Sequence, residues 1–280
     1  MGTEIVHKSC REIRKQIFIQ AYYGGGAHMG AAFSVTDILG TLYFGDVLHY
    51  RADDPSWEDR DKVILSKGHA GVALYAVLAL AGYFDKEHLK TFCQTGSNLG
   101  GHPRINEIPG VEASTGALGH GLSFAIGVAY ANKVDHRDSH VYVILGDGEC
   151  QEGSIWEGAL SAPTLALDNL TVIVDHNKLQ AMDNLENIVH MRPFADKWKA
   201  FGWNVIEIDG HNYEEIRKAL LARQTGIPTL VIANTVKGKG VSFMENVPIW
   251  HYRMPDDEEL TRLFRDLDFT EEEQRELSKG

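Results

Sequence analysis

The chain has 280 residues, of which 44% are hydrophobic and 24% are charged, and this composition is ordinary for a globular protein large enough to bury a sizeable core. A net charge of −12 argues against a general nucleic-acid binder but leaves room for a local basic pocket that holds phosphate groups. Its three cysteines form no CxxC pair and favour a reduced, cytoplasmic compartment, and the sequence lacks both a signal-peptide core and an uncharged run of the roughly 20 residues that a membrane helix needs.

The N-terminal part of the chain predicts two helices with a glycine-rich loop between them. Helical spacing of apolar residues predicts the first helix over residues 4–21, and Gly24-Gly25-Gly26 beside His28 predicts the loop. The second helix is expected from Ser34 to Leu48, with Ser34 or Thr36 as its N-cap.

The next segment predicts a strand, a buried helix and a long loop. Lys62–Ser66 is the strand, and the uncharged stretch from Ala70 to Phe84 is the buried helix. Residues 95–121 are glycine-rich and irregular, and a loop of this length in a compact domain is usually functional.

Two apolar, β-branched runs, Val141–Leu145 and Leu170–Val174, predict buried parallel strands. Asp147 follows the first run between two glycines, and Asn177 follows the second, thirty residues past Asp147. A parallel pair needs a crossover, so both side chains are expected side by side at the carboxyl edge of the sheet, where open α/β folds bind ligands. Their oxygen atoms suit Mg²⁺, and the flanking glycines allow a close approach to phosphate. A hairpin turn is the alternative, but residues 151–160 predict a loop that opens a helix rather than a second strand.

The rest of the chain completes an alternating pattern. Asn204–Ile208 and Thr229–Ala233 predict strands, and a helix is expected between them from Tyr213 to Thr225. The acidic segment from Asp256 to Gly280 predicts a solvated or partner-facing helix. We therefore expect an α/β fold with a doubly wound, mostly parallel sheet and helices on both faces, as a single domain over 1–280 with a helical or loop extension from about 245.

The spaced Gly-Asp-Gly and Asn resemble the thiamine diphosphate motif, and further motifs follow in the order seen in transketolases. These motifs are Ser66-Lys67-Gly68-His69, Gly101-His102-Pro103, Ser114-Thr115-Gly116, Gly146-Asp147-Gly148-Glu149 and Lys237-Gly238-Lys239-Gly240. Over nearly its whole length the chain resembles the diphosphate-binding half of transketolase, as found in split enzymes. The resemblance implies a thiamine diphosphate-binding fold, thiamine diphosphate and Mg²⁺ (or Ca²⁺ or Mn²⁺) as cofactors, and transfer of a two-carbon ketol unit from a ketose to an aldose.

The resemblance also implies roles for individual residues. The metal would be held by Asp147, Asn177 and the backbone carbonyl of Leu179. Residues implied to bind the cofactor are His69, Gly116, Leu118, Gly148, Asn177, Lys237 and His251. Residues implied to act in catalysis are His28, His69, His102, His251 and, at the subunit interface, Glu152. Histidines suit such roles because they exchange protons near neutral pH.

Four positions depart from the usual family pattern. Met29 stands where proline is usual, His120 replaces glutamine, Arg104 stands where an acid is common, and Tyr252 replaces a glycine after His251. Arg104, together with His28 and His102, is expected to face the substrate. These changes predict a phosphorylated or otherwise anionic, modified sugar as substrate.

Much of a transketolase is absent from this sequence. The resemblance implies a second subunit with the pyrimidine-binding and C-terminal domains, an α₂β₂ assembly, and inactivity of this chain alone. Its interface should be apolar and larger than roughly 2,000 Å². Two alternatives are a 1-deoxyxylulose phosphate synthase-like half and a non-catalytic, regulatory subunit with the same fold. Neither a nucleic acid nor a membrane is expected as a partner.

Overall fold

The computed structural model describes residues 2–181 and 183–277. Its strands are β1 (Lys62–Leu65), β2 (Val141–Gly146), β3 (Leu170–His176), β4 (Asn204–Asp209) and β5 (Thr229–Asn234). Its α-helices are α1 (Gly2–Tyr23), α2 (Met29–Phe44), α3 (Gly71–Leu80), α4 (His120–Val134), α5 (Gly153–Thr164), α6 (Leu185–Ile188), α7 (Phe194–Ala200), α8 (Tyr213–Leu220), α9 (Asp257–Asp266) and α10 (Glu271–Leu277). The 3₁₀ turns are η1 (Gly68–Ala70), η2 (Lys86–Thr91), η3 (Gly148–Gln151) and η4 (Pro248–His251).

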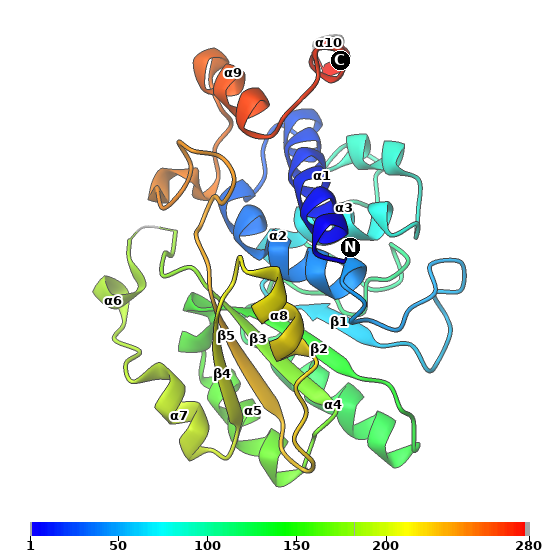
Figure 1. The fold of residues 1–280 in the computed structure, drawn as a ribbon, viewed down its shortest axis with the longest axis vertical. Coiled ribbons are helices and arrows are strands. Elements are labelled where there is room, and N and C mark those ends of the chain that lie inside the picture. Colours follow the sequence, from blue (N-terminus) through cyan, green and yellow to red (C-terminus); the bar gives the residue numbers. More distant parts are fainter. Residues whose placement is uncertain (1, 182, 278–280) are drawn as a thin grey trace.

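The five strands form one parallel sheet in the order β1-β2-β3-β5-β4 (Figure 1). In the register of β2 and β3, Gly146 lies opposite Asp175, so the two strands end at the same level. This pairing confirms the predicted parallel strands, and the residues that follow them lie at one edge of the sheet.

Both faces of the sheet are covered, as the α/β pattern predicts. Successive side chains of a strand point to opposite faces. Tyr142 and Ile144 of β2 therefore pack into the core under α1, α2, α3 and α8, whereas Val143 and Leu145 pack into a second core under α4, α5 and α7. The central strands β2, β3 and β5 are largely apolar because neither face meets water, whereas the edge strand β4 is partly exposed.

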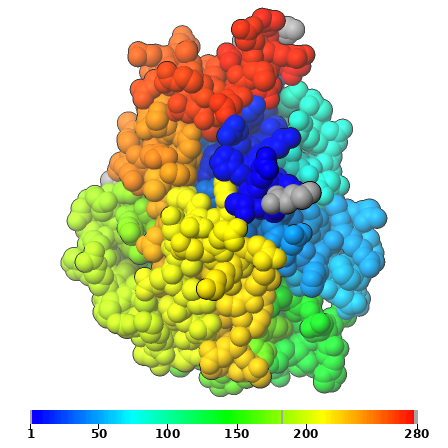
Figure 2. All heavy atoms as spheres, viewed as in Figure 1, coloured from blue at the N-terminus to red at the C-terminus, as the bar shows by residue number. Residues whose placement is uncertain are grey.

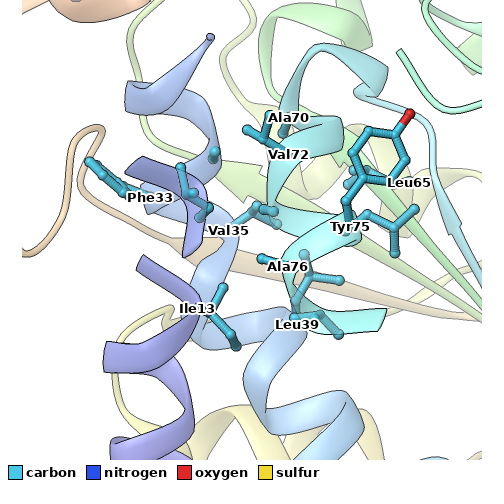
Figure 3. Packing of buried hydrophobic residues seen from close by; sticks show 14 of the residues in the cluster. Ile13, Phe33, Val35, Leu39, Leu65, Ala70, Val72, Tyr75 and Ala76 are labelled. Atoms are coloured by element: carbon cyan, nitrogen blue, oxygen red, sulfur yellow. The ribbon is translucent and has the colours of Figure 1, made fainter. Parts of the chain in front are cut away.

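The core between α1, α2 and α3 positions two loops of the site. Ile13 of α1, Leu39 of α2 and Ala76 of α3 are fully buried and lie together (Figure 3). His28 directly precedes α2, and His69 lies in η1, directly before α3. Packing of these helices therefore fixes where both histidines stand.

The predicted start of the second helix is wrong. The helix α2 begins at Met29, five residues before Ser34, and ends at Phe44. The Ser34 and Thr36 hydroxyls do not cap it, because both residues lie inside the helix. The Thr36 hydroxyl donates to the Ala32 carbonyl at 2.9 Å, and the Ser34 hydroxyl donates to the carboxylate of Asp175 on β3.

The C-terminal segment is mostly exposed, as predicted, but its apolar residues pack against the chain's own core, and a partner on this segment stays a prediction. The segment forms two helices, α9 and α10, and residues 278–280 lie outside the described residues. The Phe18 ring of α1 meets the rings of Phe264 and Phe269 edge to face, each at 5.9 Å between centroids. Figure 2 shows this red segment seated against the blue N-terminal helix. The segment thus covers part of the chain's own core.

Among the helices of the described residues, none has the combined length and apolar character needed to cross a bilayer.

Candidate active site

The carboxyl edge of the sheet opens into a cavity of about 410 Å³. Most of the residues singled out from the sequence line it together, from segments far apart in the chain. They are His69, His102, Gly116, Leu118, Asp147, Gly148, Glu152, Asn177, Leu179, Lys237 and His251. The cavity is therefore the place where a ligand would meet all of these groups at once.

Two predicted substrate contacts do not line this cavity. Arg104 is exposed, and its guanidinium lies 3.4 Å from the carboxylate of Glu107. His28 is not among the lining residues, but its ring contacts three histidines that are. A direct contact of Arg104 with substrate stays a prediction.

Oxygen atoms converge where β2 and β3 end. Asp147 is buried, and its carboxylate accepts backbone hydrogen bonds from Gly148 (2.7 Å) and Lys178 (2.6 Å). Burial raises the pKa of Asp147 to about 6 despite these donors. The side-chain carbonyl of Asn177 accepts from the Leu179 N–H at 3.1 Å. A buried carboxylate in the same cavity as an amide oxygen and a backbone carbonyl fits a hard cation such as Mg²⁺.

The Gly148 N–H, expected to bind a diphosphate, donates to Asp147 in this structure. The described residues hold no cluster of three or more His, Cys, Asp or Glu side chains that would suit a metal. A metal at this turn would therefore depend on the mixed set of carboxylate, amide and backbone oxygens.

Lys237 places a buried cation against the loop that follows β3. Its ammonium donates to the backbone carbonyl of Gln180 at 2.9 Å, and it lies 3.5 Å from the Leu179 carbonyl and 3.3 Å from Nδ1 of His251. Burial, followed by the charge of Lys67, lowers the pKa of Lys237 to about 8. Gly30 permits this placement, since a Cβ there would lie 3.3 Å from the Lys237 side chain and 2.8 Å from the Trp250 carbonyl. A phosphate group fits beside such a cation.

Four histidines gather at the mouth of the cavity. The ring of His28 lies 5.6 Å from His69, 6.2 Å from His102 and 5.1 Å from His251, measured between centroids. Burial, together with the other positive groups, lowers the pKa values of His28 and His251 to about 4 and that of His69 well below its ordinary value. These three imidazoles are therefore neutral at pH 7 and able to accept protons from a ligand.

Two side-chain amides that the sequence analysis did not single out also line the cavity. The Nε2 atoms of Gln151 and Gln180 are buried and have no hydrogen-bond partner among the described residues. A buried N–H without an acceptor is costly, so both amides fit a ligand rich in acceptor atoms. The position of Gln151, four residues after Asp147, could have indicated from the sequence that it lies near the site. The placement of Gln180 could not be predicted in this way, because it depends on the fold of the loop after β3.

Glu149 is a further residue that the sequence analysis missed. Its buried carboxylate accepts from the Ser66 hydroxyl and from the backbone N–H groups of Gly119 (2.9 Å) and Gly146 (3.0 Å). It thus joins the ends of β1 and β2 to the loop that carries Gly116 and Leu118. Its position directly after Gly148 could have indicated from the sequence that Glu149 lies at the site.

Comparison with known protein families agrees with this geometry. The family model described as the transketolase thiamine diphosphate-binding domain matches residues 9–277. The chain is 39% identical to an apulose-4-phosphate transketolase subunit of Phocaeicola vulgatus over 95% of both chains. It is 44% identical to a 6-deoxy-6-sulfo-D-fructose transketolase subunit of a Clostridium species, over 79% of this chain and 81% of that one.

Solved structures give the same result for the fold. The transketolase of Campylobacter jejuni superposes with a TM-score of 0.84 at 33% identity, over 94% of this chain and 43% of that one. The chain thus spans less than half the length of that solved transketolase.

Proposed function

The chain belongs to the transketolase family, and on that premise we propose that it is the diphosphate-binding subunit of a split, thiamine diphosphate- and Mg²⁺-dependent transketolase. The observation that carries this proposal is that one cavity joins the Asp147 turn, the Lys237 ammonium and a cluster of neutral histidines. The proposed reaction is transfer of a two-carbon ketol unit from a ketose to an aldose.

The cavity fits both cofactors. We assign Asp147, Asn177 and the Leu179 carbonyl to the metal, and Lys237, His69 and His251 to the diphosphate end. Supporting this, burial raises the pKa of the Asp147 carboxyl to about 6, and Gln151 and Gln180 present buried amide N–H groups without a hydrogen-bond partner among the described residues in the same cavity. When bound, thiamine diphosphate supplies the carbanion chemistry, while the protein orients the reactants and moves protons.

The histidines have the properties that proton transfer requires. We propose that His28 and His102 face the sugar hydroxyls and carbonyl, with His69 and His251 closer to the cofactor. Histidine is the side chain that most often accepts and returns a proton as a general base and acid. Glu152 lies exposed at the cavity rim, where a partner subunit would reach it.

An uncovered apolar face supports a partner subunit. Phe124, Tyr130 and Val134 on α4 and Leu160 on α5 are between 44% and 58% exposed. The helix α4 also buries Leu122 and Ala125 on its inner side, so it is apolar all round, which is typical of a helix covered on both sides. Leu118, 37% exposed at the cavity rim, lies just before this helix. A partner on this face would adjoin the cavity, in the proposed α₂β₂ assembly.

Two further observations support the proposed substrate class and the proposed compartment. Relatives named as subunits of transketolases for apulose-4-phosphate and for 6-deoxy-6-sulfo-D-fructose favour an anionic sugar as substrate here. The three cysteines are free thiols, which favours a reducing, cytoplasmic compartment.

The test is titration of the purified chain with thiamine diphosphate and Mg²⁺, with and without the protein encoded beside it. Metal-dependent binding that is lost in Asp147→Ala, and ketol transfer only with the partner, support the proposal. Turnover by the isolated chain contradicts the split arrangement. Absence of binding in both conditions favours the regulatory alternative.

A further inference from the structure

The four departures from the family pattern differ in where they lie. Met29 is buried in the core between α2 and its neighbours, with 1% of its surface exposed. His120 is exposed, and its Nδ1 lies 3.1 Å from the Leu118 carbonyl. Arg104 stands outside the cavity wall, beside Glu107. Tyr252 alone among the four makes a ring contact with the histidine cluster.

The Tyr252 ring rests directly on His28. The two ring centroids are 4.9 Å apart with the planes at 71°, an edge-to-face contact. Gly26 lies beneath the tyrosine, with a φ of +143°, and a Cβ there would lie 3.2–3.4 Å from the phenol ring and hydroxyl. Gly26 thus supplies the close backbone that lets the ring stand against His28.

A series of ring contacts runs from the cavity wall to the surface of the molecule. His251, His69 and His102 line the cavity, His28 contacts all three, and Tyr252 contacts His28. Tyr252 is 58% exposed, so it is the outermost ring of this series. Its ring fills space that a glycine at this position would leave open.

We propose that Tyr252 is a specificity-determining residue that limits how far a sugar extends beyond His28, so that the enzyme selects short ketoses over long ones. The inference rests on the proposed transketolase function. The ring volume, rather than the hydroxyl, carries the effect, because the contact with His28 is made by the ring. Adding or removing volume in a pocket changes discrimination between substrates by about ten- to 200-fold.

The experiment uses the chain assembled with its partner, loaded with thiamine diphosphate and Mg²⁺. The donors are hydroxypyruvate, with three carbons, xylulose 5-phosphate and sedoheptulose 7-phosphate, and kcat/KM is measured for each. We expect Tyr252→Gly to raise the ratio of the seven-carbon to the three-carbon value by at least about tenfold. Tyr252→Phe and the control Ile249→Ala, at a residue that is 63% exposed and three positions away, should leave that ratio unchanged.

Three results would overturn the inference: an unchanged ratio in Tyr252→Gly, the same increase in Tyr252→Phe, or the same increase in Ile249→Ala. Cofactor affinity, measured in parallel, should be equal in all variants because Tyr252 does not line the cavity. If the wild-type assembly uses none of the donors, including hydroxypyruvate, the proposed function itself fails, and this result is distinct from a failure of the role of Tyr252.

Discussion

Lys67, which lines the cavity, forms an ion pair with Asp175, and the two side chains are 1% and 0% exposed. The Ser34 and Thr235 hydroxyls also donate to this carboxylate. Burial alone would raise the pKa of the Asp175 carboxyl. The charge of Lys67 and these donors outweigh burial and hold that pKa below its ordinary value. The pair thus ties α2, β1, β3 and the end of β5 together at the level where the ligand groups emerge.

Replacing Asp175 with asparagine should destabilise the chain by about 3–5 kcal/mol, because the Lys67 ammonium would stay buried without its countercharge. Urea unfolding of the cofactor-free chain measures this. The matched control is Asp196→Asn, which breaks an exposed pair with Lys199 and should cost less than about 1 kcal/mol. If the free energy of unfolding falls equally in the two variants, burial does not determine how much the Lys67–Asp175 pair contributes to stability.

The neutral histidines predict how stability depends on pH. In the unfolded chain a histidine has a pKa of about 6.5, whereas His28 and His251 in the fold have values lowered to about 4. Between these two pH values, His28 and His251 bind protons in the unfolded chain but not in the folded chain. Their contribution to the free energy of unfolding is therefore complete above about pH 6.5 and is lost as the pH falls toward 4.

The double variant His28→Gln, His251→Gln lacks this contribution, so its free energy of unfolding should fall less steeply from pH 6.5 to 4 than that of the wild type. Urea unfolding of the cofactor-free chain at several pH values measures the two slopes. His190→Gln is the control, since that side chain is 87% exposed. Identical slopes for the wild type and the double variant would contradict neutral, buried imidazoles at these positions.

The sheet and its binding edge followed from the sequence because their signals are local. The runs before Asp147 and Asn177 are continuously apolar, which only strands buried on both faces need, and the parallel pairing then brings the two side chains to one edge. Assembly of the four histidines followed only from the resemblance, since they come from loops far apart in the chain.

Contacts between distant segments were not predictable in this way. Lys67 follows β1 and Asp175 lies on β3, and these strands are separated in the sheet by β2. Ser34 was expected to cap a helix because serine is a common N-cap residue, but the structure places it inside α2, where its hydroxyl donates to Asp175 of β3. The C-terminal helices were expected to be solvated because their charges outnumber the few apolar residues that cover Phe18.

The backbone conformation of Gly116 constrains which side chains the loop with Gly116 and Leu118 can carry. Its φ is +128°, and a Cβ at this position would lie 2.9 Å from Cδ2 of His102. Gly116→Ala should therefore cost about 1–3 kcal/mol of stability and weaken thiamine diphosphate binding, because the loop and His102 must separate. Gly153→Ala is the control, since a Cβ there meets no atom within 4 Å. Unchanged cofactor affinity in Gly116→Ala would mean that the loop does not contact the cofactor.

The outer face of α4 gives a prediction about the partner subunit. A glutamate in place of Phe124, which is 44% exposed, puts a charge in the middle of the apolar face and has little effect on the chain's own core. Binding of the partner, measured by calorimetry, should weaken by at least about 30-fold, as it does when a central contact of an interface is lost.

Ile5→Glu is the matched control for Phe124→Glu, because Ile5 is an exposed apolar residue of similar accessibility, 53%, on α1. It should leave binding of the partner unchanged, and thermal unfolding of the isolated chain should be similar for both variants. Since Leu118 lies at the cavity rim just before α4, loss of the partner from this face should also abolish ketol transfer while metal-dependent cofactor binding persists. If Ile5→Glu weakens the partner and Phe124→Glu does not, the partner docks on the other side of the molecule, and the cavity is completed from within this chain.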